Sequence, residues 1–270
     1  MDLKKKLLAD FGKDLPIAGG AGQSLHDPLV LIASDSSVAT DTIAEVVKCI
    51  YRVLGWYWMI VKWDVAQEGD ADIEKVTVLT KYIEGADVVT EQRNMYFDVS
   101  AVNDRAYGSQ SIPIVRLPLT TKMNLPWQLG WFHFDKLWDN SAVDPGLGVS
   151  VAYSAPRANM MVYVYDKGLG DLILADPDGC AAAEYEQAVQ EFDAMNPEAS
   201  VLSELKEKGV RIRLYESSDV TSAVVVAPFN GFFLKLRMTL QDGREKFIVD
   251  CAWHTISTFA HLVGQRHGNS

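Results

Sequence analysis

Residues 223–240, AVVVAPFNGFFLKLRMTL, consist of two apolar runs separated by Asn230-Gly231. Asn-Gly supplies the positive φ angles that a two-residue type I′ turn needs, so the stretch predicts a β-hairpin. The turn pairs Phe229 with Phe232, and alternation then pairs apolar residues with one another along one face. We expect that face to be buried. It comprises Val225, Ala227, Phe229, Phe232, Leu234 and Leu236.

The other face of this hairpin carries Lys235 and Arg237, and we expect it to be wetter. Pro228 also lies in the first run, where it cannot donate a backbone hydrogen bond to a neighbouring strand. The proline predicts that residues 224–229 lie at a sheet edge or at a bulge.

Strand and helix patterns surround the hairpin in the C-terminal half. Apolar or alternating runs predict strands over residues 130–138, 148–156, 159–166 and 210–217. Helical spacing predicts helices over 181–195 and 244–264. The second helix should bury a stripe and end at Gly264; the stripe contains Ile248, Cys251, Ala252, Ile256, Phe259, Leu262 and Val263. The order is β-β-β-α-β-β-β-α over residues 127–264.

The N-terminal half predicts a second unit of order β-α-β-β-β over residues 25–105. A short strand near residues 27–37 precedes a helix over 37–55, and strands follow over 56–65, 75–83 and 94–102. The apolar stripe of the helix contains Ile43, Val46, Val47, Ile50, Val53 and Leu54. Residues 1–24 form an N-terminal segment, 106–126 a connection and 265–270 a tail. We therefore predict an α+β protein of two units, each with an antiparallel sheet packed with helices.

Composition excludes several classes of function. The chain has 270 residues, 48% of them hydrophobic, and a formal net charge of −11. Residues 1–110 hold 11 Lys and Arg against 17 Asp and Glu, and residues 111–270 hold 14 against 19, so the acidity is spread along the chain. Such a surface disfavours nucleic acid and anionic membranes. No run approaches the ~20 apolar residues of a membrane span, and the start has no signal-peptide core, so we expect a cytoplasmic protein.

Motifs for metals, cofactors and catalysis are missing from the sequence. Cys49, Cys180 and Cys251 lie far apart, which favours buried thiols over a disulfide or a metal site. His254 and His261 lie about two helical turns apart, roughly 11 Å, which is too far for one metal ion. The glycine-rich stretches 19–22 and 166–171 lack the phosphate-binding patterns. We expect no cofactor and no metal, and no residue is assigned a catalytic role.

Aromatic residues are the remaining candidates for a binding surface. Residues 56–63 are rich in aromatics, and for these we favour a core position or a contact between the units. A second concentration would mark a protein-protein interaction surface if it is exposed; it comprises Trp127, Trp131, Phe132, Phe134 and Trp138. In the stretch NMMVYVYDKGLGD, residues 159–171, Tyr163 and Tyr165 share one strand face and the turn begins at Asp166. We expect hydroxyl hydrogen bonds rather than catalysis from these tyrosines.

Several of these stretches together resemble a known type of domain. DPGLGVSVAYSAP, VYVYDKGL, AAEYEQAVQEF and FNGFFLKLRMTL resemble a domain of uncharacterised bacterial proteins. Their order of strands and helices is similar to the Mog1/PsbP-like fold, an antiparallel sheet flanked by helices. The resemblance covers residues 127–264 and brings no catalytic residues with it. It implies a binding or assembly module, by analogy of fold alone.

The sequence thus favours a non-catalytic binding or assembly module that acts on a protein partner or on further copies of itself. The alternative is a small-molecule hydrolase or ligand-binding enzyme with a site between the two units. A third hypothesis is a purely structural subunit of a homo-oligomer.

Overall fold

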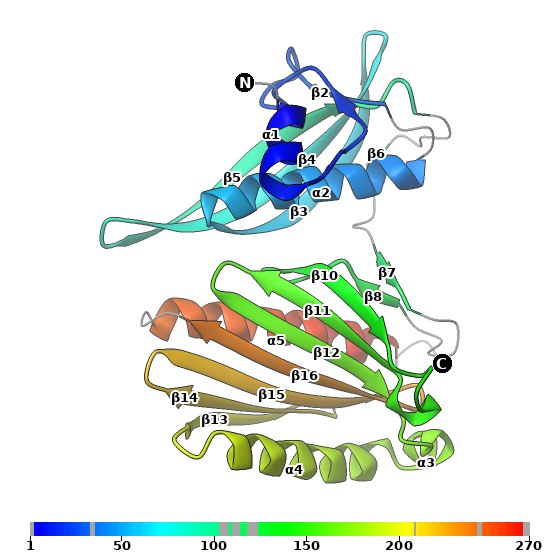
Figure 1. The fold of residues 1–270 in the computed structure, drawn as a ribbon, viewed down its shortest axis with the longest axis vertical. Helices are drawn as coiled ribbons and strands as arrows, with labels where there is room; N and C mark the ends of the chain where they lie inside the picture. The colour runs from blue at the N-terminus through cyan, green and yellow to red at the C-terminus, as the bar shows by residue number, and fades with distance from the viewer. Residues whose placement is uncertain are drawn as a thin grey trace. The chain divides into compact units, whose positions relative to one another are not determined.

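The structure is a computed structural model that describes residues 3–32, 36–102, 108–109, 114–117, 124–207, 209–241 and 245–266. The chain divides into two units, Met1–Pro113 and Ile114–Ser270 (Figure 1). The division falls within residues 106–126, where the sequence predicts a connection. Each unit contains a sheet packed with helices, and the predicted α+β class is confirmed. No helix in the described ranges is both long enough and apolar enough to span a membrane.

Unit 1 contains the predicted β-α-β-β-β order together with an additional N-terminal helix. Its elements are α1 (Leu3–Phe11), β1 (Ile17–Ala18), β2 (Leu29–Leu31), α2 (Ser36–Leu54), β3 (Tyr57–Glu68), β4 (Ala71–Glu84), β5 (Asp87–Asp98) and β6 (Gly108–Ser109). The sheet order is β1-β2-β5-β4-β3-β6, with β2 parallel to β5 and the other pairs antiparallel.

Helix α2 buries most of the predicted stripe against this sheet. Ile43, Val46 and Val47 are fully buried. The prediction is wrong for the last turn, where Val53 and Leu54 are 51% and 44% exposed. Among the aromatics of β3, Tyr57, Trp58 and Trp63 are buried, as the core interpretation predicts.

Unit 2 is built on one eight-stranded antiparallel sheet of order β13-β14-β15-β16-β12-β11-β10-β9. The elements of unit 2 that precede helix α4 are β7 (Ile114–Arg116), β8 (Asn124–Pro126), β9 (Gln128–Leu129), β10 (Phe132–Asp139), the short 3-10 helix η2 (Pro145–Leu147), β11 (Val149–Ala155), β12 (Ala158–Tyr165) and α3 (Gly170–Ala175). The others are α4 (Pro177–Met195), β13 (Ser200–Glu207), β14 (Val210–Ser217), β15 (Val220–Phe229), β16 (Phe232–Gln241) and α5 (Glu245–Arg266). The predicted order is present, and α3, β13 and the short strands are additions to it.

The β15–β16 hairpin has the predicted register. Phe229 pairs with Phe232 and Ala227 with Leu234, and the turn residues Asn230 and Gly231 have φ angles of 48° and 82°. The prediction of a sheet edge over residues 224–229 is wrong, because β15 lies between β14 and β16. The paired register with β14 ends at Val226, so Pro228 lies beyond that ladder and its missing N–H breaks no hydrogen bond there.

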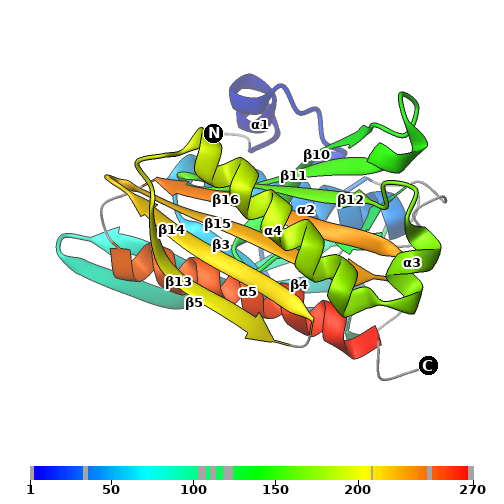
Figure 2. The ribbon, with the colours of Figure 1, turned by 90° about the horizontal axis from the view of Figure 1, so that it is seen from below.

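Two helices cover the sheet of unit 2. Helix α4 packs on β14 and β15, where Val224 and Val226 join Tyr185 and Val189 in one apolar cluster (Figures 1 and 2). We expected the face that carries Lys235 and Arg237 to be more exposed to solvent. Helix α4 covers this face, so the two side chains are only partly exposed. Helix α5 also packs on β15, on residues of the opposite alternation.

The predicted buried stripe of α5 is confirmed where its side chains are described. Its buried residues include Cys251, Ala252, Ile256 and Phe259. The side chains of Ile248, Leu262 and Val263 lie outside the described set. Gly264 does not end the helix, which continues to Arg266.

Candidate functional site

The aromatic surface predicted from residues 127–138 is largely inside the protein. Trp127, Trp131 and Phe132 are buried, Phe134 is half-buried, and Trp138 is 39% exposed. The hypothesis of a five-residue interaction surface is therefore wrong for its three buried members.

Contacts within unit 2 explain this burial. The ring of Trp127 lies 5.4 Å from that of His133, and the ring of Trp131 lies 5.9 Å from that of His254 on α5. Phe134 makes an edge-on contact with Tyr153. These aromatic side chains pack against other residues of unit 2, so they contribute to its hydrophobic core.

Exposed apolar side chains gather instead around the end of β12. Leu147, Leu169, Leu172 and Leu174 are between 40% and 63% exposed. We call these residues the leucine face. They come from η2, from the turn after β12 and from α3. Exposed apolar side chains that come from neighbouring elements are a candidate interaction site, whereas single exposed ones are ordinary.

The turn after β12 directs α3 across the end of the sheet. Asp166 accepts hydrogen bonds from Gly168 N to its side chain, at 2.9 Å, and from Leu169 N to its carbonyl, at 2.8 Å. Lys167 and Gly168 have positive φ angles of 54° and 73°, which reverse the chain. The sequence motif DKGLG is thus a structured turn leading into a helix that the sequence did not predict.

One buried side chain anchors α3. Ile173 packs against Tyr165 and Phe233 in an apolar cluster. Because α3 has only six residues, burying Ile173 turns Leu172 and Leu174 outward. These leucines are therefore exposed because α3 packs on the sheet through Ile173.

Leu147 and the α3 leucines belong to one region of unit 2. Lys167 N donates to the carbonyl of Gly146, at 3.0 Å, which ties η2 to the turn. Leu174 lies beside the β15–β16 turn, since a Cβ added to Gly231 would lie 3.4 Å from its Cγ. Three loops at this end of the sheet thus meet around the leucine face.

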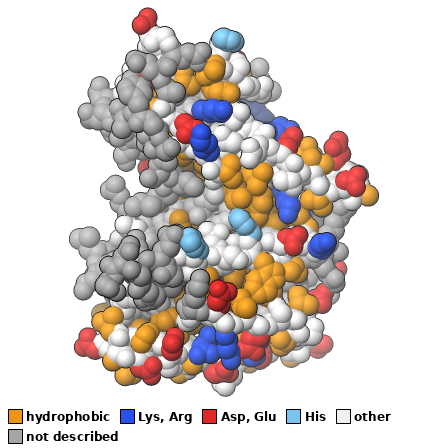
Figure 3. Space-filling model, turned by 180° about the vertical axis from the view of Figure 1, so that it is seen from behind, with side chains coloured by type: hydrophobic (Ala, Val, Ile, Leu, Met, Phe, Trp, Pro, Cys, Tyr) orange, Lys and Arg blue, Asp and Glu red, His pale blue; other side chains and the backbone are white. Residues whose placement is uncertain are grey.

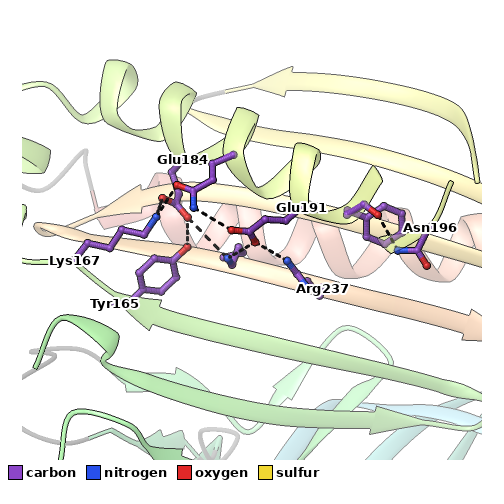
Figure 4. Close-up of polar contacts among 9 residues, drawn as sticks. Tyr165, Lys167, Glu184, Glu191, Asn196 and Arg237 are labelled. Carbon is purple, nitrogen blue, oxygen red and sulfur yellow. Dashed lines mark hydrogen bonds and ion pairs between the residues drawn. The ribbon is translucent and has the colours of Figure 1, made fainter. Parts of the chain in front are cut away.

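A buried polar network fastens α4 next to this turn (Figure 4). Glu184 is buried, and Tyr165 donates a hydrogen bond of 2.5 Å to its Oε1. The ammonium of Lys167 lies 2.5 Å from Glu184 Oε2 and also donates to Gln187, at 3.0 Å. The ammonium of Lys235 lies 3.9 Å from Glu184 Oε1.

The network continues along α4 through Glu191. Arg237 Nη2 lies 2.9 Å from Glu191 Oε2, and Lys235 Nζ lies 3.8 Å from the same oxygen (Figure 4). Gln187 donates to Glu191 Oε1, at 3.0 Å. One face of α4 is therefore bound to β16 by charge-assisted contacts as well as by apolar packing.

Burial and these partners shift two pKa values in opposite directions. Burial, reinforced by the hydrogen bond to Glu184, raises the pKa of Tyr165 well above its ordinary value. Burial lowers the pKa of Lys235, although Glu191 and Glu184 partly oppose that shift. Both carboxylates of the network have cationic partners, whereas Arg237 Nε is buried without a hydrogen-bond partner among the described residues. Neither the cavity in unit 1 nor the smaller cavity beside α5 is lined by these groups. We interpret the network as the support of the leucine face rather than as reacting groups.

Acidic residues flank the residues of the leucine face in the sequence. They include Asp144, Asp166, Asp171 and Asp176. Asp144 also holds η2 by accepting from Gly146 N at 2.8 Å, and Asp176 caps α4 by accepting from Gly179 N at 3.0 Å. Between residues 139 and 178 the cations are Arg157 and Lys167; Arg157 lies in the turn between β11 and β12, and Lys167 pairs with Glu184. In Figure 3, hydrophobic, acidic and basic side chains lie next to one another over the lower part of unit 2.

In the described part of the chain, no group of three or more His, Cys, Asp or Glu side chains is arranged to hold a metal ion. Cys251 is buried, and the ring of His254 lies against Trp131.

No protein-family model, curated protein or solved structure matches this chain. The resemblance of residues 127–264 to the Mog1/PsbP-like fold therefore stays a prediction. Functional inference depends on the site geometry alone.

Proposed function

We propose that the protein is a non-catalytic binding or assembly module that holds a protein partner on the leucine face of unit 2. The observation that carries the proposal is the set of outward leucines seated on a fixed support. Ile173 anchors α3 from below, and the network around Glu184 holds α4 beside it. A rigid support favours binding, because little conformational entropy is lost when the partner docks.

The charges around the leucine face indicate the chemistry of the partner. Aspartates lie next to the leucines in the sequence, and Lys167, which precedes α3, is paired with Glu184. A complementary partner presents apolar side chains flanked by Lys and Arg, as a basic amphipathic helix does. The Mog1/PsbP-like resemblance supports a binding role by analogy of fold only.

A peptide-binding experiment tests this proposal. A labelled basic amphipathic helix of Leu, Lys and Arg, and an otherwise identical peptide with Glu at the basic positions, are titrated with the full chain by fluorescence anisotropy. We expect the basic peptide to bind at least tenfold more tightly. The Leu172→Ser/Leu174→Ser double variant should weaken that binding about tenfold or more, since two anchors are lost.

A matched control uses Val201→Ser/Leu202→Ser on β13, whose side chains are also exposed. This control should bind the basic peptide as the unaltered chain does. Equal binding by the Leu172/Leu174 variant and the unaltered chain would overturn the proposal. Light scattering of the unaltered chain adds a second readout, because a dimer abolished by the same leucine substitutions would assign the face to another copy of this chain.

The alternative of a ligand-binding protein draws its support from unit 1. A cavity inside that unit favours it.

A further inference from the structure

Helix α1 lies over a cavity of about 790 Å³ within unit 1. The walls come from α1, from the glycine-rich segment of residues 17–23, from the last two turns of α2 and from β5. This volume falls in the range of roughly 300–1,000 Å³ that is typical of small-molecule sites.

Protein side chains do not fill this space. Leu7 is the buried residue of α1, although α1 also directs Leu3 and Phe11 toward the cavity. The cavity explains why Val53 and Leu54 are exposed despite their place in the apolar stripe of α2, since both line it. An apolar wall without packing partners loses dispersion contacts, and an apolar ligand would restore them.

The glycine-rich segment forms a closely packed wall of backbone. Gly20 has a φ of 71°, and a Cβ at this position would lie 1.8 Å from the carbonyl oxygen of Pro28. The carbonyl of Gly22 accepts a hydrogen bond of 2.9 Å from Tyr96 N on β5. Only glycine allows the chain to approach β2 so closely here, which leaves room for the cavity on its other side.

The charged side chains that line the cavity are all cationic among the described residues: Lys4, Lys6 and Arg93. They give the lining a positive charge in a chain whose formal net charge is −11.

Each of these cations has an acidic partner that does not itself line the cavity. Lys4 Nζ lies 3.5 Å from Asp14, and Lys6 Nζ lies 2.6 Å from Asp10. Arg93 Nε donates to Glu91, at 2.6 Å. The lysine pairs are solvent-exposed and the arginine pair partly so, and exposed pairs contribute little stability, so an incoming anion can share these cations at small cost.

We propose that unit 1 binds a small amphipathic anion, with its apolar body between α1 and α2 and its carboxylate or phosphate group near Lys4, Lys6 and Arg93. This site is separate from the leucine face and does not depend on it. The ring of Trp56, which stacks on Tyr82 at 4.0 Å and lies 4.5 Å from the Arg93 guanidinium, holds that cation beside the cavity.

Fluorescence titration of the full chain tests the proposal with two probes, dansyl-undecanoic acid and its uncharged methyl ester. We expect the acid to bind at least tenfold more tightly than the ester. The Lys4→Gln/Lys6→Gln/Arg93→Gln variant should lose that preference while it still binds the ester. The control Lys5→Gln/Lys75→Gln/Lys81→Gln removes the same charge from residues outside the cavity lining and should keep the preference.

A second variant locates the binding. Val53→Trp places a large side chain in the cavity and should abolish binding of both probes, with circular dichroism showing that unit 1 stays folded. Failure of both probes to bind the unaltered chain, or equal binding of acid and ester, would overturn the inference. So would unchanged binding by a folded Val53→Trp protein.

Competition distinguishes the two head groups. Dodecanoate and dodecyl phosphate are each used to displace the bound probe. Displacement by either supports the inference, and the tighter competitor identifies the head group; displacement by neither contradicts it.

Discussion

The hydroxyl of Tyr165, the last residue of β12, donates a hydrogen bond of 2.5 Å to Oε1 of Glu184 in the middle of α4. The two residues are 19 positions apart, and the segment between them contains the turn and α3. This single contact closes a loop that carries Leu169, Leu172 and Leu174 of the leucine face. Because Glu184 is buried, its charge also depends on Lys167 and Lys235 for compensation.

Replacing Glu184 with Gln should therefore destabilise unit 2. The substitution removes the ion pair of Lys167 and one of the two α4 carboxylates, Glu184 and Glu191, that face the partly buried Lys235. Breaking one side of a buried pair costs about 3 kcal/mol, which we expect in the free energy of unfolding measured with urea. Glu186→Gln, on the exposed side of the same helix turn, should change it by less than about 0.5 kcal/mol. Similar values for the two variants would show that the network contributes no stability.

Alkaline pH should destabilise the protein through its buried tyrosines. Burial raises the pKa of both Tyr165 and Tyr153, so in the folded state they keep protons that the unfolded chain releases above pH about 10. Their contribution is fully present below that pH and is lost as the pH rises through and beyond it. The free energy of unfolding, measured in urea between pH 8 and 11, should fall at the upper end.

Tyr165→Phe should make that fall shallower, and Tyr163→Phe provides a control on the same strand. Lys235 acts in the opposite direction, because its lowered pKa makes folding more favourable as the pH rises toward 10.5. Comparing the two phenylalanine variants removes this opposing contribution. An unchanged slope in Tyr165→Phe would contradict the assignment.

Gly148→Ala should be strongly destabilising. Gly148 has a φ of 56°, and a Cβ there would lie 1.9 Å from the carbonyl oxygen of Val164. The clash involves the backbone of β12 where it pairs with the start of β11 and cannot be relieved by a side-chain rotation, so we expect a loss of about 3 kcal/mol or more. Gly168→Ala has a comparable φ of 73° but an open surrounding, and should cost about 1 kcal/mol. Thermal denaturation of both variants measures the difference.

Ile173→Ala should separate the anchor of α3 from its exposed face. Removing the buried side chain that packs on Tyr165 and Phe233 should cost about 3 kcal/mol and expose α3 to limited proteolysis. Leu172→Ala, at the neighbouring exposed position, should change the free energy of unfolding by less than about 0.5 kcal/mol. Equal protease resistance in Ile173→Ala and the unaltered chain would contradict the anchoring role.

The elements that could be predicted from the sequence are those whose signals are local. The β15–β16 hairpin follows from Asn230-Gly231 and from the alternation on either side, and its register is the predicted one. The predicted stripe of α5 is buried wherever its side chains are described. Helix α3 could not be found in the same way, since six residues give too short a pattern and no capping side chain marks its start.

The candidate sites depend on contacts between residues far apart in the chain. Trp131 looked suited to an exposed surface, but His254 lies against it, 123 positions away. Leu172 and Leu174 looked like ordinary apolar residues, and only the seating of Ile173 turns them outward. The stretch GLGDLILA, residues 168–175, held one sign of this exposure. Its leucines lie beside two glycines and fit neither the helical nor the strand period.

The sequence by itself determined the fold class, the order of the main strands and helices and the register of the central hairpin, because turn chemistry and side-chain alternation act between near neighbours. Only the tertiary structure decided which apolar residues are exposed and which charges are buried. Lys235 shows the difference: alternation places it on the face opposite Leu234 and Leu236, yet α4 covers that face. Whether a side chain meets water is decided by the element that packs over it, and in this chain that element is usually distant in sequence.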